Sequence, residues 1–355
     1  LLLQGFQGRL VDRVRAVLDS PWARHTSLRH TLAALLLMAA GVVAIALVTG
    51  SLAEVRSSTG AWLLAHIHRI LIAGSYPAAA VASEIPNTFY NPLYPALVAG
   101  ISAILPGDWP GAPTVVGHVI SAAALGLAAL PLYALWRSVG GRSTGIVGVG
   151  ALLFPPMVAT ASLVRYDSLA IVLVLLCAWA GWSAVQDGKA WKWLAAGLCA
   201  GLVYNTREFL SAPALGALGV AWVLRVVPAY RRAGTAEQRR TSAADGARGL
   251  GASLLGLAIG GVLVPVSLRL SPMGGLDALL GYAVRGEAVA RPGTTLWETL
   301  YLQIIGIPLV LGLAGLLITA WLRRGPGRQA ALVLLGTLAP FVAFLISDQQ
   351  SPQYY

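Results

Sequence analysis

The sequence predicts an all-α, polytopic membrane protein, and three properties of the chain support this class. Of its 355 residues, 57% are hydrophobic and only 11% are charged, whereas soluble domains carry about 25% charged residues. The mean hydropathy is +0.73. Long apolar segments recur along the chain, and the basic residues gather in alternate connections between them. This combination is typical of a transmembrane helical bundle.

A helix needs about 20 apolar residues to cross the hydrocarbon core of a bilayer. By this criterion we expect a cytoplasmic segment 1–30 and a transmembrane domain 31–355 with about nine spans: 31–50, 114–136, 145–163, 168–185, 191–206, 209–227, 249–268, 300–321 and 329–347.

Segment 92–105 is also apolar, but it has only fourteen residues and contains Pro92 and Pro95. We therefore expect an interfacial or re-entrant helix there, inside a first external loop that covers 51–113. An amphipathic run around His66 and His68 precedes it in the same loop. The two histidines are two residues apart on the expected helix, so they point in different directions and do not suit one metal ion.

The distribution of charge orients the bundle. With 92–105 excluded as a span, eighteen of the 25 lysines and arginines fall on the side of the N-terminus or its flanks, together with five of the 14 acids. The positive-inside rule makes that side cytoplasmic. The net charge of +11 is then mainly an orientation signal, and we expect no nucleic-acid partner. Segment 228–248, basic and rich in Ala and Gly, is predicted to be a flexible cytoplasmic loop.

Two acid–base corners fall on the opposite, extracytoplasmic side of this predicted plasma- or inner-membrane protein. Arg165-Tyr166-Asp167 lies at an outer turn, and Arg207-Glu208 follows at the next outer corner. Charges beside a bilayer are costly unless they are paired or functional. An arginine fork suits a lipid-borne phosphate. The alternatives are local ion pairs that stabilise each turn and an arginine that snorkels to the interface.

Glu54 is the candidate general base. It follows the first predicted span by about four residues, and a carboxylate near apolar surface has a raised pKa and can accept a proton from a hydroxyl. The alternative is a solvated acid paired with Arg56.

Three motifs in this order resemble the GT-C superfamily of membrane glycosyltransferases, which includes the protein O-mannosyltransferases and the aminoarabinose transferases. Tyr90-Asn91-Pro92-Leu93-Tyr94-Pro95 is similar to the Pro-Pro-Leu-Tyr-like patch that closes the first external loop in that family. Arg165-Tyr166-Asp167 is similar to an Arg-Pro-Asp-like turn, and Thr206-Arg207 to a Thr-Lys-like corner. Ser351-Pro352-Gln353-Tyr354-Tyr355 resembles the start of a further external patch, so we expect the natural chain to continue.

The resemblance implies transfer of a sugar from a polyprenyl-phosphate donor to a hydroxyl of a lipid, glycan or protein, with inversion. Glu54 and Asp167 would be catalytic, and Arg165 and Arg207 would bind the phosphate. Tyr90, Asn91, Tyr94, Glu84 and His66 would line the substrate cavity. No cofactor is certain, and a divalent metal is needed by some relatives only. In the family the first acid stands near Ser57 to Gly60 and the residue at 166 is commonly Pro, so this chain departs at both places.

Two other classes of protein are consistent with the composition. One is a lipid or solute transporter, but transporters commonly contain inverted repeats and charges near the middle of the membrane. Here the charges lie at span ends and no repeat is visible. The other is a non-catalytic membrane protein that keeps the GT-C fold without its base.

Overall fold

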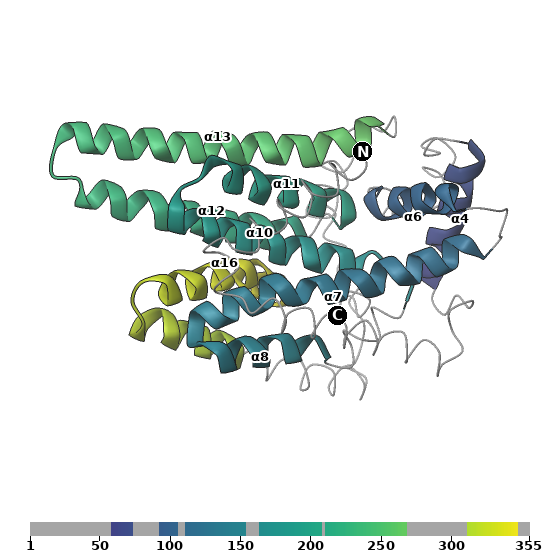
Figure 1. Cartoon of the computed structure of the whole chain (residues 1–355), viewed down its shortest axis with the longest axis horizontal. Helices are drawn as coiled ribbons and strands as arrows, with labels where there is room; N and C mark the ends of the chain where they lie inside the picture. The colour runs from purple at the N-terminus through teal and green to yellow at the C-terminus, as the bar shows by residue number, and fades with distance from the viewer. Residues whose placement is uncertain are drawn as a thin grey trace, which may run out of the picture.

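The computed structural model describes residues 58–73, 92–105, 111–153, 163–207, 210–267 and 311–346. Within these ranges the regular elements are all helical, which confirms the predicted all-α class. Figure 1 shows the long helices lying side by side. The elements are α4 (Ser58–Ala73), α6 (Leu93–Ile104), α7 (Ala112–Gly140), α8 (Arg142–Gly150), η2 (Ala151–Leu153), α10 (Asp167–Asp187), α11 (Ala190–Thr206), α12 (Ser211–Arg232), α13 (Ala236–Ser267) and α16 (Pro326–Ile346), with a short apolar helix Leu311–Leu322 before α16.

Four of these helices are long and apolar enough to cross a membrane: α7, α10, α12 and the Ala236–Leu263 part of α13. They correspond to four of the nine predicted spans. α11 covers the predicted span 191–206 with 17 residues, and α16 covers 329–347 up to Ile346. The predicted spans 31–50, 145–163 and 300–321 lie wholly or partly outside the described residues.

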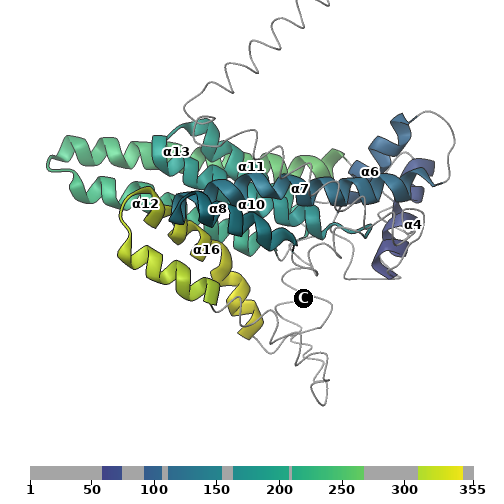
Figure 2. The ribbon, with the colours of Figure 1, turned by 60° about the horizontal axis from the view of Figure 1, so that its bottom comes forward.

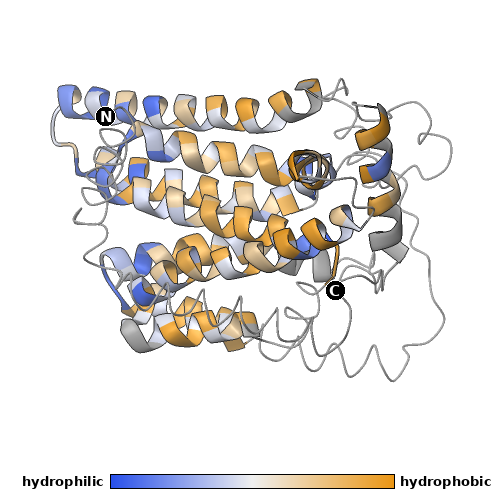
Figure 3. Ribbon diagram, turned by 45° about the vertical axis from the view of Figure 1, so that its right-hand side comes forward, coloured by the Kyte–Doolittle hydropathy of each residue, from blue (hydrophilic) through white to orange (hydrophobic). Residues whose placement is uncertain are grey.

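The bundle has two chemically different ends. Helices α10, α11, α12 and α13 alternate in direction. Figure 3 shows hydrophilic residues gathered at one end of the bundle and apolar residues along most of the remaining length of the helices. At that end Gln186 Nε2 donates to Gln329 Oε1 at 2.7 Å, and Arg225 Nη1 donates to the Val185 carbonyl at 3.4 Å. We call it the basic end, because it carries Arg137, Lys189, Lys192, Arg225, Arg231, Arg232, Arg239, Arg240, Arg323, Arg324 and Arg328. The opposite end carries Arg165, Asp167 and Arg207, and we call it the arginine–aspartate end.

Glycines close the turns at the basic end. Gly141 follows α7 with φ +96°, Gly188 ends α10 with φ +70°, and Gly325 precedes α16 with φ +67°. These left-handed conformations favour glycine, which has no Cβ. Pro326 then begins α16, where its missing N–H costs nothing because the first helical donors have no intrahelical partner.

The prediction of a flexible loop over 228–248 is wrong. α12 continues to Arg232 and α13 begins at Ala236, so the two helices form a hairpin at the basic end (Figure 1). A capping box begins α13. The Gln238 N–H donates to Thr235 Oγ1 at 3.2 Å, and Gln238 Oε1 accepts from the N–H groups of Gly234 and Thr235 at 2.9 and 3.4 Å. This local hydrogen bonding overrides the loop-like composition.

α11 and α13 pack in direct backbone contact through two glycine pairs. A Cβ at Gly197 would overlap the Ser253 carbonyl, and a Cβ at Gly256 would overlap the Leu194 carbonyl. Gly201 and Gly260 face the partner helix in the same way, as small-xxx-small spacings allow. Asn205 Nδ2 then donates to the Gly260 and Gly261 carbonyls at 2.7 and 3.1 Å. The C-terminus of α11, which leads into Arg207, is therefore fixed in place.

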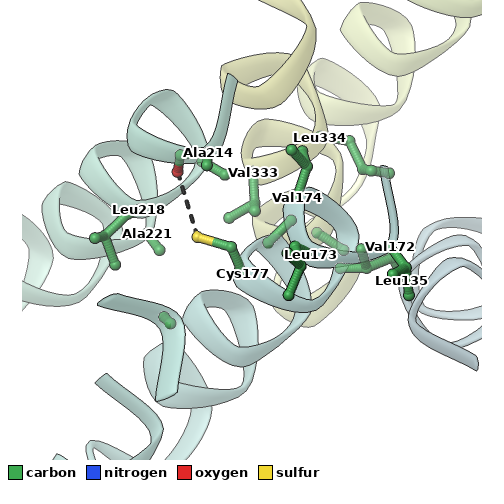
Figure 4. Close-up of a cluster of buried hydrophobic side chains, with 14 of the residues drawn as sticks. Leu135, Val172, Leu173, Val174, Cys177, Ala214, Leu218, Ala221, Val333 and Leu334 are labelled. Atoms are coloured by element: carbon green, nitrogen blue, oxygen red, sulfur yellow. Dashed lines mark hydrogen bonds between the residues drawn. The ribbon is translucent and has the colours of Figure 1, made fainter. Parts of the chain in front are cut away.

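The main apolar core lies between α7, α10, α11, α12 and α16. Figure 4 shows Leu173 and Val174 of α10 close to Val333 and Leu334 of α16. Cys177 is fully buried there, and its Sγ donates to the Ala214 carbonyl at 3.4 Å. The thiol thus serves as a small packing group, and both cysteines are free.

A second, smaller core joins α4, α6 and the start of α7. Its members are Leu63, Leu64, Ile67, Ile70, Tyr94, Val98, Ala99, Val116, Val164 and Tyr166. Figures 1 and 2 show α4 running across the direction of the long helices. The 12 residues of α6 span about 18 Å, less than the roughly 30 Å of the hydrocarbon core. This length agrees with the prediction that 92–105 is not a span, and the small core lies directly behind the Arg165 turn.

Candidate active site

One carboxylate and two guanidinium groups meet at the arginine–aspartate end. Asp167 opens α10, Arg165 lies in the turn just before it, and Arg207 follows the last residue of α11. Arg165 Nε lies 3.0 Å from Asp167 Oδ2, and Arg207 Nη1 lies 3.1 Å from Asp167 Oδ1. The predicted pair within the turn is present, and the structure adds Arg207 to it from another helix. Glu208, the other predicted partner of Arg207, lies outside the described residues.

The helix ends favour these charges. A carboxylate is stabilised in the first turn of a helix and a cation at a helix C-terminus, and Asp167 and Arg207 occupy those positions. The side chains are 18% and 7% exposed, whereas Arg165 is 24% exposed. Partial burial lowers the local dielectric constant and strengthens each attraction. The three groups carry a net charge of +1, with Arg165 the more accessible cation.

The aromatic ring of Tyr166 packs against the guanidinium group of Arg207. Its side chain is buried, and the Arg207 guanidinium carbon lies 4.8 Å from the centre of its ring. A cation placed over an aromatic face is attracted by the ring quadrupole. This explains the departure at position 166, because a proline could not form the contact.

A chain of hydrogen bonds through Tyr94 of α6 and Ser121 of α7 holds the backbone of the turn that contains Arg165. Tyr94 Oη donates to the Gly117 carbonyl at 2.8 Å and lies 3.0 Å from Ser121 Oγ. Ser121 Oγ donates to the Arg165 carbonyl at 2.9 Å. Burial raises the pKa of the Tyr94 hydroxyl well above its usual value.

The sequence-predicted site residues separate into three groups. Arg165, Asp167 and Arg207 come together. Tyr94, expected in the cavity wall, is instead fully buried behind the turn with its hydroxyl engaged on α7. Glu54, Glu84, Tyr90 and Asn91 lie outside the described residues, as does the side chain of His66, whose backbone belongs to α4.

Sequence reasoning missed Ser121 and its neighbour His118. Both are buried on α7, three residues apart and hence on one face of the helix. Polar residues inside a membrane-spanning segment are rare and generally face the bundle interior. The pair in an otherwise apolar span was therefore a usable signal, whereas the partner of Ser121, 44 residues away, was not readable.

The described residues do not form a site for a divalent metal. Both oxygens of Asp167 face guanidinium groups, and no cluster of three His, Cys, Asp or Glu side chains occurs in the described part of the chain.

Residues 90–232 match the family model described as dolichyl-phosphate-mannose-protein mannosyltransferase. The matched segment starts in the Tyr90–Pro95 patch, includes Arg165, Asp167 and Arg207, and ends with the last residue of α12. The resemblance to GT-C glycosyltransferases is thereby confirmed over this part of the chain. Glu54, His66 and Glu84 precede it. No curated protein and no solved structure matches the chain.

Proposed function

We propose that this protein is a glycosyltransferase that takes a sugar from a polyprenyl-phosphate donor on the extracytoplasmic face of the membrane. The acceptor is a hydroxyl group of a lipid, a glycan or a protein. The observation that carries the proposal is the Arg165–Asp167–Arg207 cluster at the end of an apolar helical bundle, within the segment that matches the mannosyltransferase family. A lipid phosphate needs both features, because its chain requires apolar surface and its phosphate requires positive charge.

The reaction needs a base, an orienting group and a cation. A carboxylate, for which Glu54 is our candidate, removes the proton of the acceptor hydroxyl. The acceptor oxygen then attacks the anomeric carbon, the bond from that carbon to the phosphate oxygen breaks, and polyprenyl phosphate leaves with inversion. Asp167 orients the acceptor or the sugar.

The two arginines have different parts in this scheme. Arg165 is the more exposed, so we assign it the contact with the departing phosphate, where negative charge develops. Arg207 is buried against Tyr166 and Asp167, so it adds positive charge and holds Asp167. Pre-positioned charge of this kind contributes about 10²- to 10³-fold to rates.

The test is transfer from radiolabelled polyprenyl-phospho-sugars in membranes that contain wild-type protein or Asp167→Asn. We expect Asp167→Asn to lower transfer about 100-fold or more. Asp187→Asn is the matched control, because Asp187 lies at the other end of α10 and pairs with Lys192 at 2.9 Å. Its transfer should stay within about threefold of wild type, because that pair lies far from the cluster.

The outcomes separate the reaction from the residue roles. Absence of transfer by the wild-type protein with every donor tried would overturn the proposed function. Wild-type transfer that Asp167→Asn leaves intact would remove Asp167 from the site. Glu54→Gln tests the base in the same assay, and we expect a loss of about 10²- to 10⁴-fold.

A further inference from the structure

Ser121 makes an unusual hydrogen bond for a serine in a long helix. Hydroxyls in such helices commonly donate to the carbonyl four residues earlier. Ser138 does so to Ala134 at 2.8 Å, and Thr337 to Val333 at 2.9 Å. Ser121 donates instead to the carbonyl of Arg165, at 2.9 Å and 44 residues away. It is fully buried, so water does not compete for this bond.

Tyr94 explains why Ser121 bonds so far away. The carbonyl four residues before Ser121 belongs to Gly117, and Tyr94 Oη donates to it at 2.8 Å. The local acceptor of Ser121 is thus already occupied. Ser121 Oγ also lies 3.0 Å from Tyr94 Oη. The tyrosine proton is donated to the Gly117 carbonyl and the serine proton to the Arg165 carbonyl, so the two oxygens are in close contact without a further hydrogen bond between them.

Gly117 makes this approach sterically possible. A Cβ at this position would lie 2.8 Å from Val164 Cγ1 and 3.2 Å from Tyr94 Oη. The missing side chain therefore lets both the tyrosine hydroxyl and the residue before Arg165 reach the surface of α7.

We propose that Tyr94 and Ser121 are positioning residues that tether the backbone of Arg165 to α7 and so set the geometry of the Arg165–Asp167–Arg207 cluster. The role rests on the proposed function, because it deepens the same site. Both side chains are fully buried, so we assign neither a contact with the substrate. Tyr94 keeps Ser121 from bonding locally, Ser121 holds the Arg165 carbonyl, and the Arg165 and Asp167 side chains project from the turn that results.

The proposal predicts a specific order of dependence. In Tyr94→Phe the Gly117 carbonyl becomes free, so the Ser121 hydroxyl can rotate to it and release Arg165. Ser121→Ala releases Arg165 directly. The double variant should therefore be no worse than Ser121→Ala alone, because the tyrosine acts through the serine.

Hydrogen–deuterium exchange of the purified full chain in detergent is the decisive measurement. We expect amides of residues 163–170 to exchange about fivefold faster or more in Tyr94→Phe and in Ser121→Ala. Ser138→Ala is the matched control, since it removes a serine hydroxyl from the same helix whose bond is only local. It should leave 163–170 unchanged. Tyr94→Phe removes one oxygen and keeps the buried ring, so it preserves the test even if Ser121→Ala does not fold.

Transfer kinetics supply the second measurement. We expect kcat to fall about tenfold in both variants with little change in KM for the donor, because misplaced groups mainly cost transition-state stabilisation. Unchanged exchange at 163–170 in both variants would overturn the tether, as would strictly additive effects in the double variant. If the wild-type protein transfers no sugar, the proposed function fails, and the exchange data still decide whether the tether exists.

Discussion

At the scale of single residues, Asp167 is the point where two helices and a turn are held together. Its two oxygens contact Arg165 and Arg207, and Tyr166 lies under Arg207. The structural explanation, that the cluster stabilises helix ends, and the functional one are compatible. A cluster that only fixed helix ends would need no net charge, whereas this one retains an accessible guanidinium at Arg165.

Arg207→Lys separates charge from shape at this site. Lysine keeps the positive charge but loses the planar group that stacks on Tyr166 and approaches the carboxylate. We expect a loss of about 1 to 2 kcal/mol in the free energy of unfolding, seen as a lower melting temperature in detergent, and transfer reduced about tenfold or more. The change should be accompanied by looser packing of Tyr166.

Arg225→Lys is the control for this substitution. Arg225 is at the basic end, where its guanidinium donates to the Val185 carbonyl at 3.4 Å. The Arg225→Lys substitution should therefore leave sugar transfer unchanged. Equal transfer by Arg207→Lys and wild type would mean that only the charge of Arg207 matters, contrary to the role assigned to the stack.

Part of this site was predictable at the residue level. Two helices, α10 and α11, separate Asp167 from Arg207 along the chain. Because the chain crosses the bundle twice between them, the order of the predicted spans is enough to place both residues at the same end. Their 3.1 Å contact depends on how α10, with 21 residues, and α11, with 17 residues, pack against each other and on the Gly188 turn between them. The bond from Ser121 to Arg165 could not be predicted, because it depends on how α6 and α7 cross.

At the scale of elements, hydrophobic length located the helices better than composition located the loops. α10 and α12 begin and end within a few residues of the predicted spans, except that α12 runs on to Arg232. The prediction of a loop over 228–248 is wrong because the capping hydrogen bonds at Thr235 and Gln238 start a helix in spite of the loop-like composition. Thr235-Ala236-Glu237-Gln238 is a readable capping box, and it begins α13.

The contact between α11 and α13 yields a test of close packing. Gly256→Ala places a Cβ against the Leu194 carbonyl, an atom that cannot rotate away, so the helices must separate. We expect a loss of about 1 to 3 kcal/mol in the free energy of unfolding, the usual cost of overpacking. The displaced α11 carries Arg207 at its end, so transfer should fall as well.

Gly251→Ala is the matched control on the same helix. A Cβ at Gly251 meets no atom within 4 Å, and alanine favours helix over glycine by about 1 kcal/mol. Thermal melts in detergent should therefore show Gly251→Ala equal to or above the wild-type protein. If Gly256→Ala melts like Gly251→Ala, the backbone contact between α11 and α13 is not present in the folded protein.

At the scale of the whole molecule, the two ends of the bundle carry different charges, and this difference predicts its orientation. The positive-inside rule places the end with more arginine and lysine in the cytoplasm. The hairpin between α12 and α13 belongs to that end and carries several arginines close to its turn. The same rule predicts that the Arg165–Asp167–Arg207 cluster faces outward, as the proposed function requires.

Single cysteines at the two ends test this orientation in a chain whose own Cys177 and Cys199 are replaced by alanine. Gly234→Cys lies in the exposed α12–α13 turn and Leu105→Cys in an exposed position after α6. We expect a membrane-impermeant maleimide to label Leu105→Cys in intact cells, and Gly234→Cys only in inverted vesicles. Labelling after detergent solubilisation shows that both thiols are reactive. Labelling of Gly234→Cys from outside intact cells would reverse the bundle, and the cluster would then have to work on the cytoplasmic face, with cytoplasmic donors and acceptors.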